Sequence, residues 1–167
     1  MSICNPTKHI KELENPPKWT EEEKNVIAWS IDWEGSICLK KGTDKRNSSG
    51  FNIQPIICLG NTNLPLLQKF FDIVKIGKIY QSRKQNLKHK ACFMWIIRNF
   101  DDVEYFLSNI HPYLCAKKQQ SSIILEFLKS RKERGIENKQ QLPYSQFEID
   151  CINRTRKYNK KGPRINE

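Results

Sequence analysis

Paired cysteines in a C-x-x-C arrangement are missing from the sequence, which also contains only three histidines. None of these histidines stands at ligand spacing from a cysteine, so we expect no structural zinc site. The six cysteines are spread along the chain at Cys4, Cys38, Cys58, Cys92, Cys115 and Cys151. We expect them to be free thiols, and Cys38, Cys58 and Cys92 to be small packing residues in strands.

Long hydrophobic runs are missing as well. No apolar run approaches the roughly 18–20 residues that a membrane span needs. No apolar stretch precedes the first charged residues, as it would in a secretory signal peptide. We therefore expect an intracellular protein in a reducing compartment (cytoplasm, nucleoid or organelle matrix), with no membrane partner. Hydrophobic residues make up 38% of the chain and fall in clusters, which is enough for a buried core.

Acidic residues are scarce compared with basic ones. The chain has 29 lysines and arginines against 18 aspartates and glutamates, a net charge of +11. Residues 75–90 and 151–166 each carry six basic residues and no acidic one. Positive charge that is segregated in this way favours a polyanionic partner, either nucleic acid or an anionic membrane surface. The alternative is that the lysines only keep the protein soluble.

Hydrophobic periodicity and turn residues predict a helix, two strands, a helix, two strands and three helices. Thr20 followed by Glu23 is a capping box that opens the first helix, and Gly35 ends it. The expected helices are 20–33, 64–75, 101–110, 113–134 and 145–158, and the expected strands are 36–41, 51–59, 77–83 and 91–98. Pro55 predicts a bulge or an edge position in the second strand. The expected segments are a flexible arm over 1–19, a domain over 20–134, and a C-terminal helix with a basic tail over 135–167.

This order predicts an α+β fold, with a four-stranded antiparallel curved sheet and helices on one of its faces. The opposite face would be polar and basic, with no apolar stripe suited to a core. Its side chains would be those of Ser36, Cys38, Lys40, Asn52, Gln54, Lys78, Tyr80, Ser82, Met94 and Arg98. A curved sheet with such a face exposed suits the DNA major groove, where strands can present side chains to base edges. The alternative is an ordinary solvated face.

The segment IAWSIDWEGS at residues 27–36 combines small and apolar residues with the pattern I-D-x-acid-G-S, directly before a strand. It resembles the LAGLIDADG motif of the homing endonucleases. Three further segments are similar to this family: NTNLPLLQKFFDIVKIGKIYQSR at 61–83, HPYLCAKKQQ at 111–120 and KYNKKG at 157–162. The resemblance implies the αββαββα-type endonuclease domain of single-motif members, which work as homodimers through the motif helix.

The chemistry of such a site fits the motif. Hydrolysis of a phosphodiester needs a metal held by hard oxygen ligands such as carboxylates. The resemblance places the metal-binding acid at Glu34, and the carbonyl of Gly35 could approach the ion because no Cβ is in the way. One carboxylate per chain is too few to cut two strands, so a two-fold axis must supply the second. The alternative is that Glu34 is a solvated acid at a helix end. Asp32 points to another side of the helix, and the resemblance implies a structural role for it, in capping or in hydrogen bonding between helices.

The resemblance also implies catalytic roles for Lys117 and Asn61. Lys117 would stabilise charge on the phosphorane and organise solvent, although its neighbour Lys118 is easily confused with it. Asn61 would position water, but a turn asparagine more often serves the turn itself. Beside the sheet-face residues, the expected DNA contacts are Lys41, Lys45, Arg46, Arg83, Lys84, Lys88, Lys90, Lys118, Arg154, Arg156 and Lys157. Because most of these would contact phosphates, binding should weaken steeply with salt.

Two positions depart from the family pattern. Its third and seventh motif positions are usually small residues that give the paired helices close contact, and here they are Trp29 and Trp33. The indoles would have to widen the helix crossing, turn outward, or pack into the monomer's own core, which their size favours. The dimer contacts that the resemblance implies are Ile27, Ala28, Ser30 and Ile31.

Together, the residues and the resemblance predict a site-specific double-strand DNA endonuclease that is active as a homodimer. It would use Mg²⁺ or Mn²⁺, with Ca²⁺ binding without supporting cleavage. The resemblance implies that the protein is encoded within an intron and leaves 3′ overhangs at a long, roughly palindromic target. The first alternative is a catalytically inactive DNA- or RNA-binding protein on the same scaffold, such as an RNA maturase or a regulator. The second is a protein–protein module with an incidental basic tail, whose affinity for DNA would barely respond to salt.

Overall fold

The computed structural model describes residues 9–45, 48–85, 87–135 and 142–159, and its elements follow the predicted order. The helices are α1 Glu21–Glu34, α2 Leu64–Val74, α3 Phe100–Ile110, α4 Lys118–Glu133 and α5 Gln146–Tyr158. The strands are β1 Gly35–Thr43, β2 Phe51–Asn61, β3 Lys78–Arg83 and β4 Cys92–Ile97. Short 3₁₀ turns occupy Ile10–Glu12 and His111–Tyr113. Arg46, the start of the expected arm and the basic tail after residue 159 lie outside the described residues.

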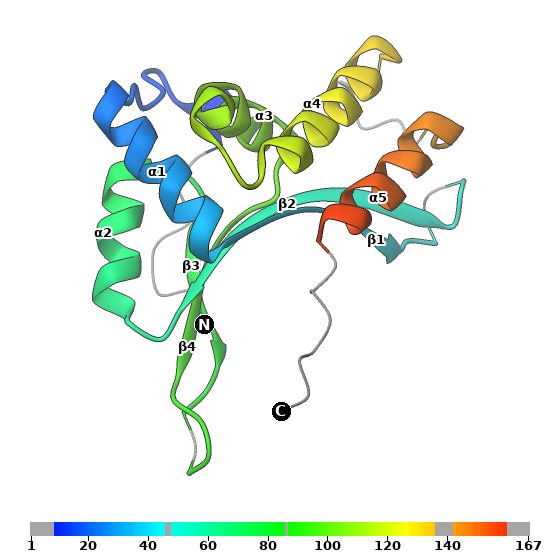
Figure 1. The fold of residues 1–167 in the computed structure, drawn as a ribbon. Coiled ribbons are helices and arrows are strands. Elements are labelled where there is room, and N and C mark those ends of the chain that lie inside the picture. The colour runs from blue at the N-terminus through cyan, green and yellow to red at the C-terminus, as the bar shows by residue number, and fades with distance from the viewer. Residues whose placement is uncertain (1–8, 46–47, 86, 136–141, 160–167) are drawn as a thin grey trace.

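The strands form one antiparallel, four-stranded sheet in the order β1-β2-β4-β3. Figure 1 shows this sheet curving beneath α1, α3 and α4, while the end of the β3–β4 hairpin extends away from the helices. The predicted α+β class and curved antiparallel sheet are therefore confirmed. No helix in the described ranges is long and apolar enough to cross a membrane.

One hydrophobic core fills the space between the sheet and the helices. Ile31 of α1, Phe106 of α3, Phe127 of α4 and Trp95 of β4 are fully buried in it. Burying a side chain of this size contributes about 1.5–3 kcal/mol. The Trp95 indole N–H donates to the carbonyl of Ile76 at 2.9 Å, so its polar group is satisfied inside the core. The sheet is thus held rigidly from one side.

α5 is attached to the same core. Ile152 is buried in the cluster, and the fully buried Glu148 carboxylate accepts a hydrogen bond from Arg134 at 2.8 Å. Pairing of this kind offsets the large cost of burying a charge. At the end of α5, the Asn159 side-chain N–H donates to the carbonyl of Ile37 at 3.0 Å. The outer edge of β1 is therefore fixed by α5.

The strand register identifies the residues on the sheet face opposite the core. Directly paired residues share a face. Across the sheet, Ser36 pairs with Cys58, Cys58 pairs with Ile96, and Ile96 pairs with Lys78. By this register the face carries Ser36, Cys38, Lys40, Asn52, Gln54, Lys78, Tyr80 and Met94. These are eight of the ten residues that the sequence predicted for it. Arg98, just after β4, lines a cleft together with Lys78 and Ile96 of this face.

One detail of the predicted face is wrong, and one of its strands is irregular. The register puts Ile56 and Ile96 on it, 7% and 3% exposed, and neither belongs to the main core cluster. The face therefore does carry an apolar stripe. An irregularity in β3 also makes Arg83 the partner of Cys92, so Ser82 is the unpaired residue of the strand. A bulge inserts one extra residue and shifts the alternation beyond it.

The bulge predicted at Pro55 is wrong, and the edge position is right. β1 and β2 pair without interruption, from the pair of Gly35 with Leu59 to the pair of Thr43 with Phe51. β4 pairs with β2 only from Ile57 onward, so Pro55 has no strand on its other side. Proline is tolerated there because no ladder hydrogen bond is lost.

The helix predicted to begin at Tyr113 begins at Lys118 instead. His111–Tyr113 is a 3₁₀ turn, and Leu114 after it is extended, with φ −73° and ψ 136°. The sequence contains the breaker Pro112 but gives no sign of where the helix resumes. That point is set by a contact with α1, which is part of the site.

Candidate functional site

α1 carries the motif residues and ends at the sheet. It opens with a reciprocal capping box, in which Thr20 accepts the Glu23 N–H at 3.2 Å and Glu23 accepts the Thr20 N–H at 2.8 Å. It ends at Glu34, where the N–H of Gly35 donates to the carbonyl of Ile31. A Cβ at Gly35 would lie 2.7 Å from that oxygen and 2.8 Å from the Ile31 Cα. Glycine is therefore needed for β1 to start directly after α1, and this joint positions Glu34.

The last turn of α1 is negatively charged and holds no basic residue of its own. Asp32 and Glu34 lie there, at the end where the helix macrodipole is also negative. Glu34 is exposed, and among the described residues its carboxylate has no hydrogen bond or ion pair. This charge does not stabilise the helix, and it makes the end of α1 a favourable place for a cation.

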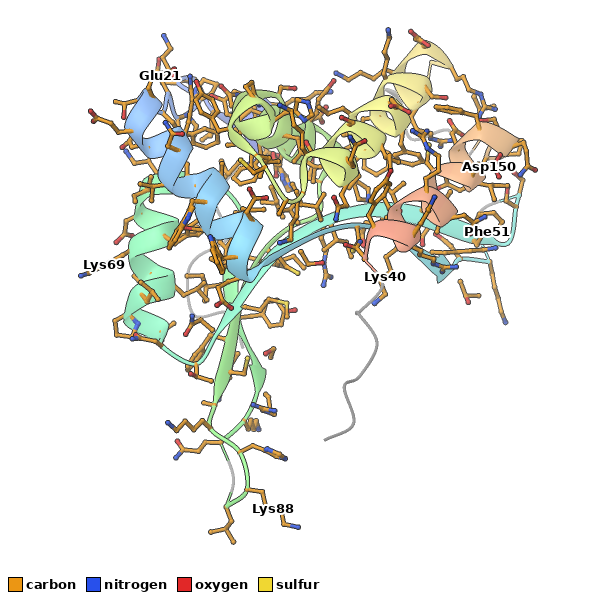
Figure 2. All side chains as sticks on the ribbon, viewed as in Figure 1. Glu21, Lys40, Phe51, Lys69, Lys88 and Asp150 are labelled. Atoms are coloured by element: carbon orange, nitrogen blue, oxygen red, sulfur yellow. The ribbon has the colours of Figure 1, made fainter. Side chains whose placement is uncertain are left out.

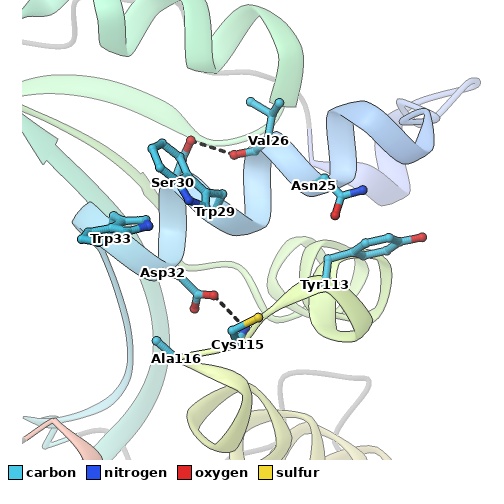
Figure 3. Close-up of a pocket in the computed structure, with 9 residues that line it drawn as sticks. All are labelled: Asn25, Val26, Trp29, Ser30, Asp32, Trp33, Tyr113, Cys115 and Ala116. Carbon is cyan, nitrogen blue, oxygen red and sulfur yellow. Dashed lines mark hydrogen bonds between the residues drawn. The ribbon is translucent and has the colours of Figure 1, made fainter.

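Asp32 ties the end of α1 to the start of α4, in the bonding role predicted for it. Its carboxylate accepts the main-chain N–H of Cys115 at 2.7 Å, as Figure 3 shows, and that of Lys117 at 2.9 Å. The Lys117 ammonium donates in return to the main-chain carbonyl of Asp32. Lys117 is thus held beside the end of α1, and α4 resumes directly after this contact.

The electrostatic environment of Lys117 includes Glu34. Burial lowers the pKa of the Lys117 ammonium below its usual value, while the charges of Asp32 and Glu34 act in the opposite direction. Lys118, the neighbour that the sequence could not separate from it, is an exposed first residue of α4. The structure therefore holds Lys117 beside Asp32, within the electrostatic range of Glu34 but without an ion pair to it, and leaves Lys118 outside the Asp32 contact.

Asn61 lies at the same cleft as Glu34. It ends β2, and Glu34 and Asn61 line the same small cleft between α1 and α2. The Asn61 side-chain oxygen accepts the N–H of Asn63 at 2.8 Å, which shapes the turn into α2. The turn role is thus observed, and the predicted role in positioning water stays a prediction.

Three of the four predicted dimer contacts are wrong, because they lie inside the monomer. Ile27 and Ile31 are 0% exposed and Ala28 is 1% exposed. Ser30 is half-buried, with its hydroxyl donating to the carbonyl of Val26 at 2.8 Å. These aliphatic residues face the core, which removes them from any surface that a second chain could contact.

The tryptophans occupy the outer face of α1. Trp29 is 66% exposed and Trp33 is 71% exposed, so the expectation that they pack into the core is wrong. Figure 3 shows both indoles beside a cleft between α1 and the segment before α4. Val26 on α1 and Leu66 on α2 are also exposed, at 49% and 54%. We call Val26, Trp29, Trp33 and Leu66 the tryptophan patch.

The helical repeat could have revealed this arrangement. At 100° per residue, positions 26, 29 and 33 fall on one side of a helix, and positions 27, 28 and 31 fall on the other. The side with the β-branched isoleucines is the one that meets the sheet. The sequence therefore held the signal, but the resemblance to small motif residues pointed to the wrong side.

The predicted phosphate contacts fall into different environments. Figure 2 shows Lys40 on the side of the sheet away from the helices and Lys88 near the end of the β3–β4 hairpin. Lys41 pairs with Ile53 on the opposite, core-facing side, with its ammonium 3.8 Å from the Phe51 ring centroid. The predicted residues with exposed side chains in loops or helices are Lys45, Lys84, Lys88, Lys90, Lys118, Arg154, Arg156 and Lys157.

Arg154 has a partner within the chain. Its guanidinium donates to Glu126 of α4 at 2.7 Å, on the outer side of α5. A contact between Arg154 and DNA would have to replace this exposed pair, which typically contributes under 1 kcal/mol. Arg154 is therefore less available than Arg156 and Lys157, which are exposed on the same helix.

The donor set at the end of α1 fits a hard cation only in part. Glu34 offers a free carboxylate, whereas both oxygens of Asp32 already accept main-chain N–H groups. In the described part of the chain there is no cluster of three or more histidine, cysteine, aspartate or glutamate side chains that could hold a metal. At the end of α1, one chain therefore supplies one free carboxylate, that of Glu34.

Sequence comparisons return nothing for this chain, neither among protein-family models nor among curated proteins. Solved structures do match. The archaeal intron-encoded homing endonuclease I-Vdi141I complexed with DNA covers 88% of this chain and 90% of its own, at 17% identity and a TM-score of 0.68. The homing endonuclease I-CvuI, in complex with its target and 2 mM Ca, covers 89% and 90%, at 14% identity and a TM-score of 0.63.

A third structure is matched over part of its length. The I-SmaMI LAGLIDADG homing endonuclease bound to cleaved DNA covers 80% of this chain, at 16% identity and a TM-score of 0.59. The match takes up only 42% of the I-SmaMI chain. This chain therefore corresponds to less than half of that endonuclease and to nearly all of I-Vdi141I.

Proposed function

We propose that this chain, which has the fold of the LAGLIDADG homing endonucleases, is a site-specific endonuclease that cuts both strands of duplex DNA. One observation carries the proposal: the unpaired carboxylate of Glu34 projects at the end of α1, in the same electrostatic environment as Lys117. Both residues lie near the point where α1 joins the sheet, and the sheet face opposite the core carries lysines and no acidic residue among its described members.

A divalent cation is the cofactor that the end of α1 would take. Glu34 and the carbonyl of Gly35 are the groups that would hold Mg²⁺ or Mn²⁺, which prefer oxygen ligands. Such an ion polarises a phosphate and lowers the pKa of bound water. Ca²⁺ is a hard cation as well, and we expect it to bind without supporting cleavage.

Lys117 would act on the phosphate directly. Its ammonium is half-buried and held by the Asp32 carbonyl, so little of its freedom remains to be lost when a phosphate arrives. A fixed positive charge in a partly desolvated position stabilises the charge that develops on a phosphate during hydrolysis. Asn61, which lines the same cleft as Glu34, is proposed to position water beside that carboxylate.

The active unit would be a homodimer, because each chain supplies one free carboxylate for two DNA strands. The tryptophan patch on α1 and α2 supports this, since an exposed apolar surface of large side chains marks an interaction site. The patch adjoins Glu34 along α1, so pairing through it would bring the two carboxylates near the dyad. The partial match to I-SmaMI also fits a unit built from two copies.

DNA would lie along the sheet face that carries Lys40, Lys78 and Arg98. Loop lysines at the ends of both hairpins would contact flanking phosphates, and the target would be long and roughly palindromic. By likeness to the intron-encoded I-Vdi141I, we propose that the protein mobilises an intron and leaves 3′ overhangs.

The test begins with selection of cleaved sites from a random duplex library in Mg²⁺. The wild-type chain should enrich one roughly two-fold symmetric sequence and cut both of its strands. Glu34→Gln should bind the same duplex and cut neither strand. Glu22→Gln, an exposed acid in the first turn of the same helix, is the matched control and should cut normally.

Two outcomes would overturn the proposal. Tight binding to a selected duplex, with no cleavage in Mg²⁺ or Mn²⁺, would identify an inactive DNA- or RNA-binding protein on this scaffold. Normal cleavage by Glu34→Gln would show that the acid at the end of α1 is not part of the chemistry.

A further inference from the structure

The middle of the sheet face opposite the core is apolar. Ile56 and Ile96 lie there almost fully buried, outside the main core cluster, with Cys38 and Cys58 half-buried beside them. Cys38 pairs directly with Ile56, and Cys58 pairs directly with Ile96. Four apolar side chains therefore form two adjacent rows, which we call the apolar rows.

The strand register places the two thiols on one face in adjacent rows, because Cys38 pairs with Ile56 and Cys58 pairs with both Ser36 and Ile96. Burial raises the pKa of both thiols above the usual value. They therefore stay neutral, and a neutral thiol behaves as a small hydrophobic group.

Polar and basic side chains surround the apolar rows. Lys78 continues the row of Cys58 and Ile96, and Lys40 with Gln54 forms the next row outward. Arg98 lies close enough to Cys58 for its charge to lower the thiol pKa. The surface is thus an apolar strip inside a basic rim, which complements a partner that is apolar at one point and negatively charged around it.

We propose that the apolar rows read thymine C5-methyl groups in the major groove, a specificity that rests on the proposed DNA-binding function. The thymine methyl is the one apolar group that base edges present in that groove, and small apolar side chains are its usual partners. Cys38 and Cys58 carry the contact, because Ile56 and Ile96 are already covered and serve to support them.

The spacing of the rows on the sheet limits which base pairs of the target can show the thymine preference. Successive rows on one sheet face lie about 7 Å apart, which is about two base-pair steps of duplex. Ser36 follows Gly35 and begins the row of Cys58, so this row adjoins the end of α1. The thymine preference should therefore cover a short block of each half-site, near the position of Glu34.

The test uses the duplex that the full-length protein selects from a random library in Ca²⁺. Each thymine is replaced singly by deoxyuridine, which removes only the methyl group. Loss of one methyl contact should weaken binding about fourfold, at one or two neighbouring positions per half-site. Replacement elsewhere in the duplex should leave the affinity unchanged.

A matched pair of variants connects the effect to the thiols. Cys58→Ser places a polar hydroxyl in nearly the same volume. At the base that Cys58 contacts, the affinities for the thymine and the uracil duplex should then become nearly equal. Cys58→Ala keeps the surface apolar and should retain most of the preference, and the same pair is made at Cys38. Circular dichroism and thermal unfolding check that each variant is folded.

The outcomes separate this inference from the proposed function. Failure to select any duplex would overturn both. Selection of a duplex whose affinity is unchanged by every thymine-to-uracil replacement would overturn the inference alone. If thymine-to-uracil replacement weakened binding equally in Cys38→Ser, Cys58→Ser and the wild type, residues other than these cysteines would contact the methyl groups, and the inference would be overturned.

Discussion

The Asp32 carboxylate accepts the main-chain N–H of Lys117 at 2.9 Å, while the Lys117 ammonium donates to the main-chain carbonyl of Asp32. This reciprocal contact joins the last turn of α1 to the first turn of α4. It fixes the basic group at the helix end that also carries Glu34. Asp32 is therefore a positioning residue, and its effect on the site can be separated from that of Glu34.

Replacing Asp32 should damage both stability and the site. Asp32→Ala leaves the N–H groups of Cys115 and Lys117 without their acceptor, at a cost of about 1–3 kcal/mol. The side chain in Asp32→Asn can accept hydrogen bonds through one oxygen only. The stability and the cleavage rate of this variant should therefore lie between those of Asp32→Ala and of the wild type. Urea unfolding measures the stability, and cleavage of the selected duplex measures the site. Equal stability of Asp32→Ala and wild type would contradict this assignment.

Lys117→Ala should slow cleavage about 10²–10³-fold, the usual loss when one donor to a developing charge is removed. DNA binding should change little, because many other basic residues contact the backbone. Lys129→Ala is the control, since Lys129 lies on the outer side of α4 in an exposed pair with Glu133. The rate of single-turnover cleavage at saturating protein is measured for Lys117→Ala and Lys129→Ala. Similar rates for the two variants would rule out a direct role for Lys117.

The double variant Trp29→Ser, Trp33→Ser should convert a dimer into a monomer. Both indoles are mostly exposed in the single chain, so their loss should have little effect on the free energy of unfolding of the monomer. Phe147→Ser, at an exposed aromatic residue of α5 that is 45% exposed, is the matched control. Sedimentation equilibrium gives the mass of each protein. A dimer that persists in the double variant would place the interface elsewhere.

Much of the fold could be predicted because its signals are local. The capping box of Thr20 and Glu23, the glycine at position 35 and the period-2 strands each specify an element from neighbouring residues. The position of Glu34 at the end of α1 followed from the same signals. The start of α4 could not be predicted, because it depends on Asp32, which lies 85 residues from Lys117 in the chain.

Burial was harder to predict than secondary structure. Ile56 and Ile96 sit in strands whose other face also holds isoleucines, so alternation alone did not reveal two apolar surfaces. The size of the Trp29 and Trp33 side chains favours burial in the core over an outward position. Their exposure follows from the phase of α1, in which Ile27 and Ile31 take the core side. Side-chain size was the weaker guide, and helical phase was the stronger one.

His9 is attached to α3 through Asp102. Its ring Nδ1 lies 2.8 Å from the Asp102 carboxylate, which also accepts the N–H of Ile10 at 2.8 Å. Asp102 is 5% exposed, so this contact anchors the segment before α1 to the core. The hydrogen bond to Asp102 raises the pKa of His9 above its usual value, and burial opposes it.

This attachment should loosen as the pH rises. A group whose pKa is higher in the folded state stabilises the fold fully below its unfolded pKa, about 6.5 for histidine. The contribution is then lost as the pH rises through the folded pKa of His9. Above neutral pH, hydrogen exchange at the Ile10 amide should therefore be faster than the pH-dependent increase in the intrinsic chemical exchange rate alone explains. His9→Gln keeps a side chain that can hydrogen-bond but does not titrate, so its protection should lose this pH dependence. The same dependence in His9→Gln and wild type would assign the effect to another group.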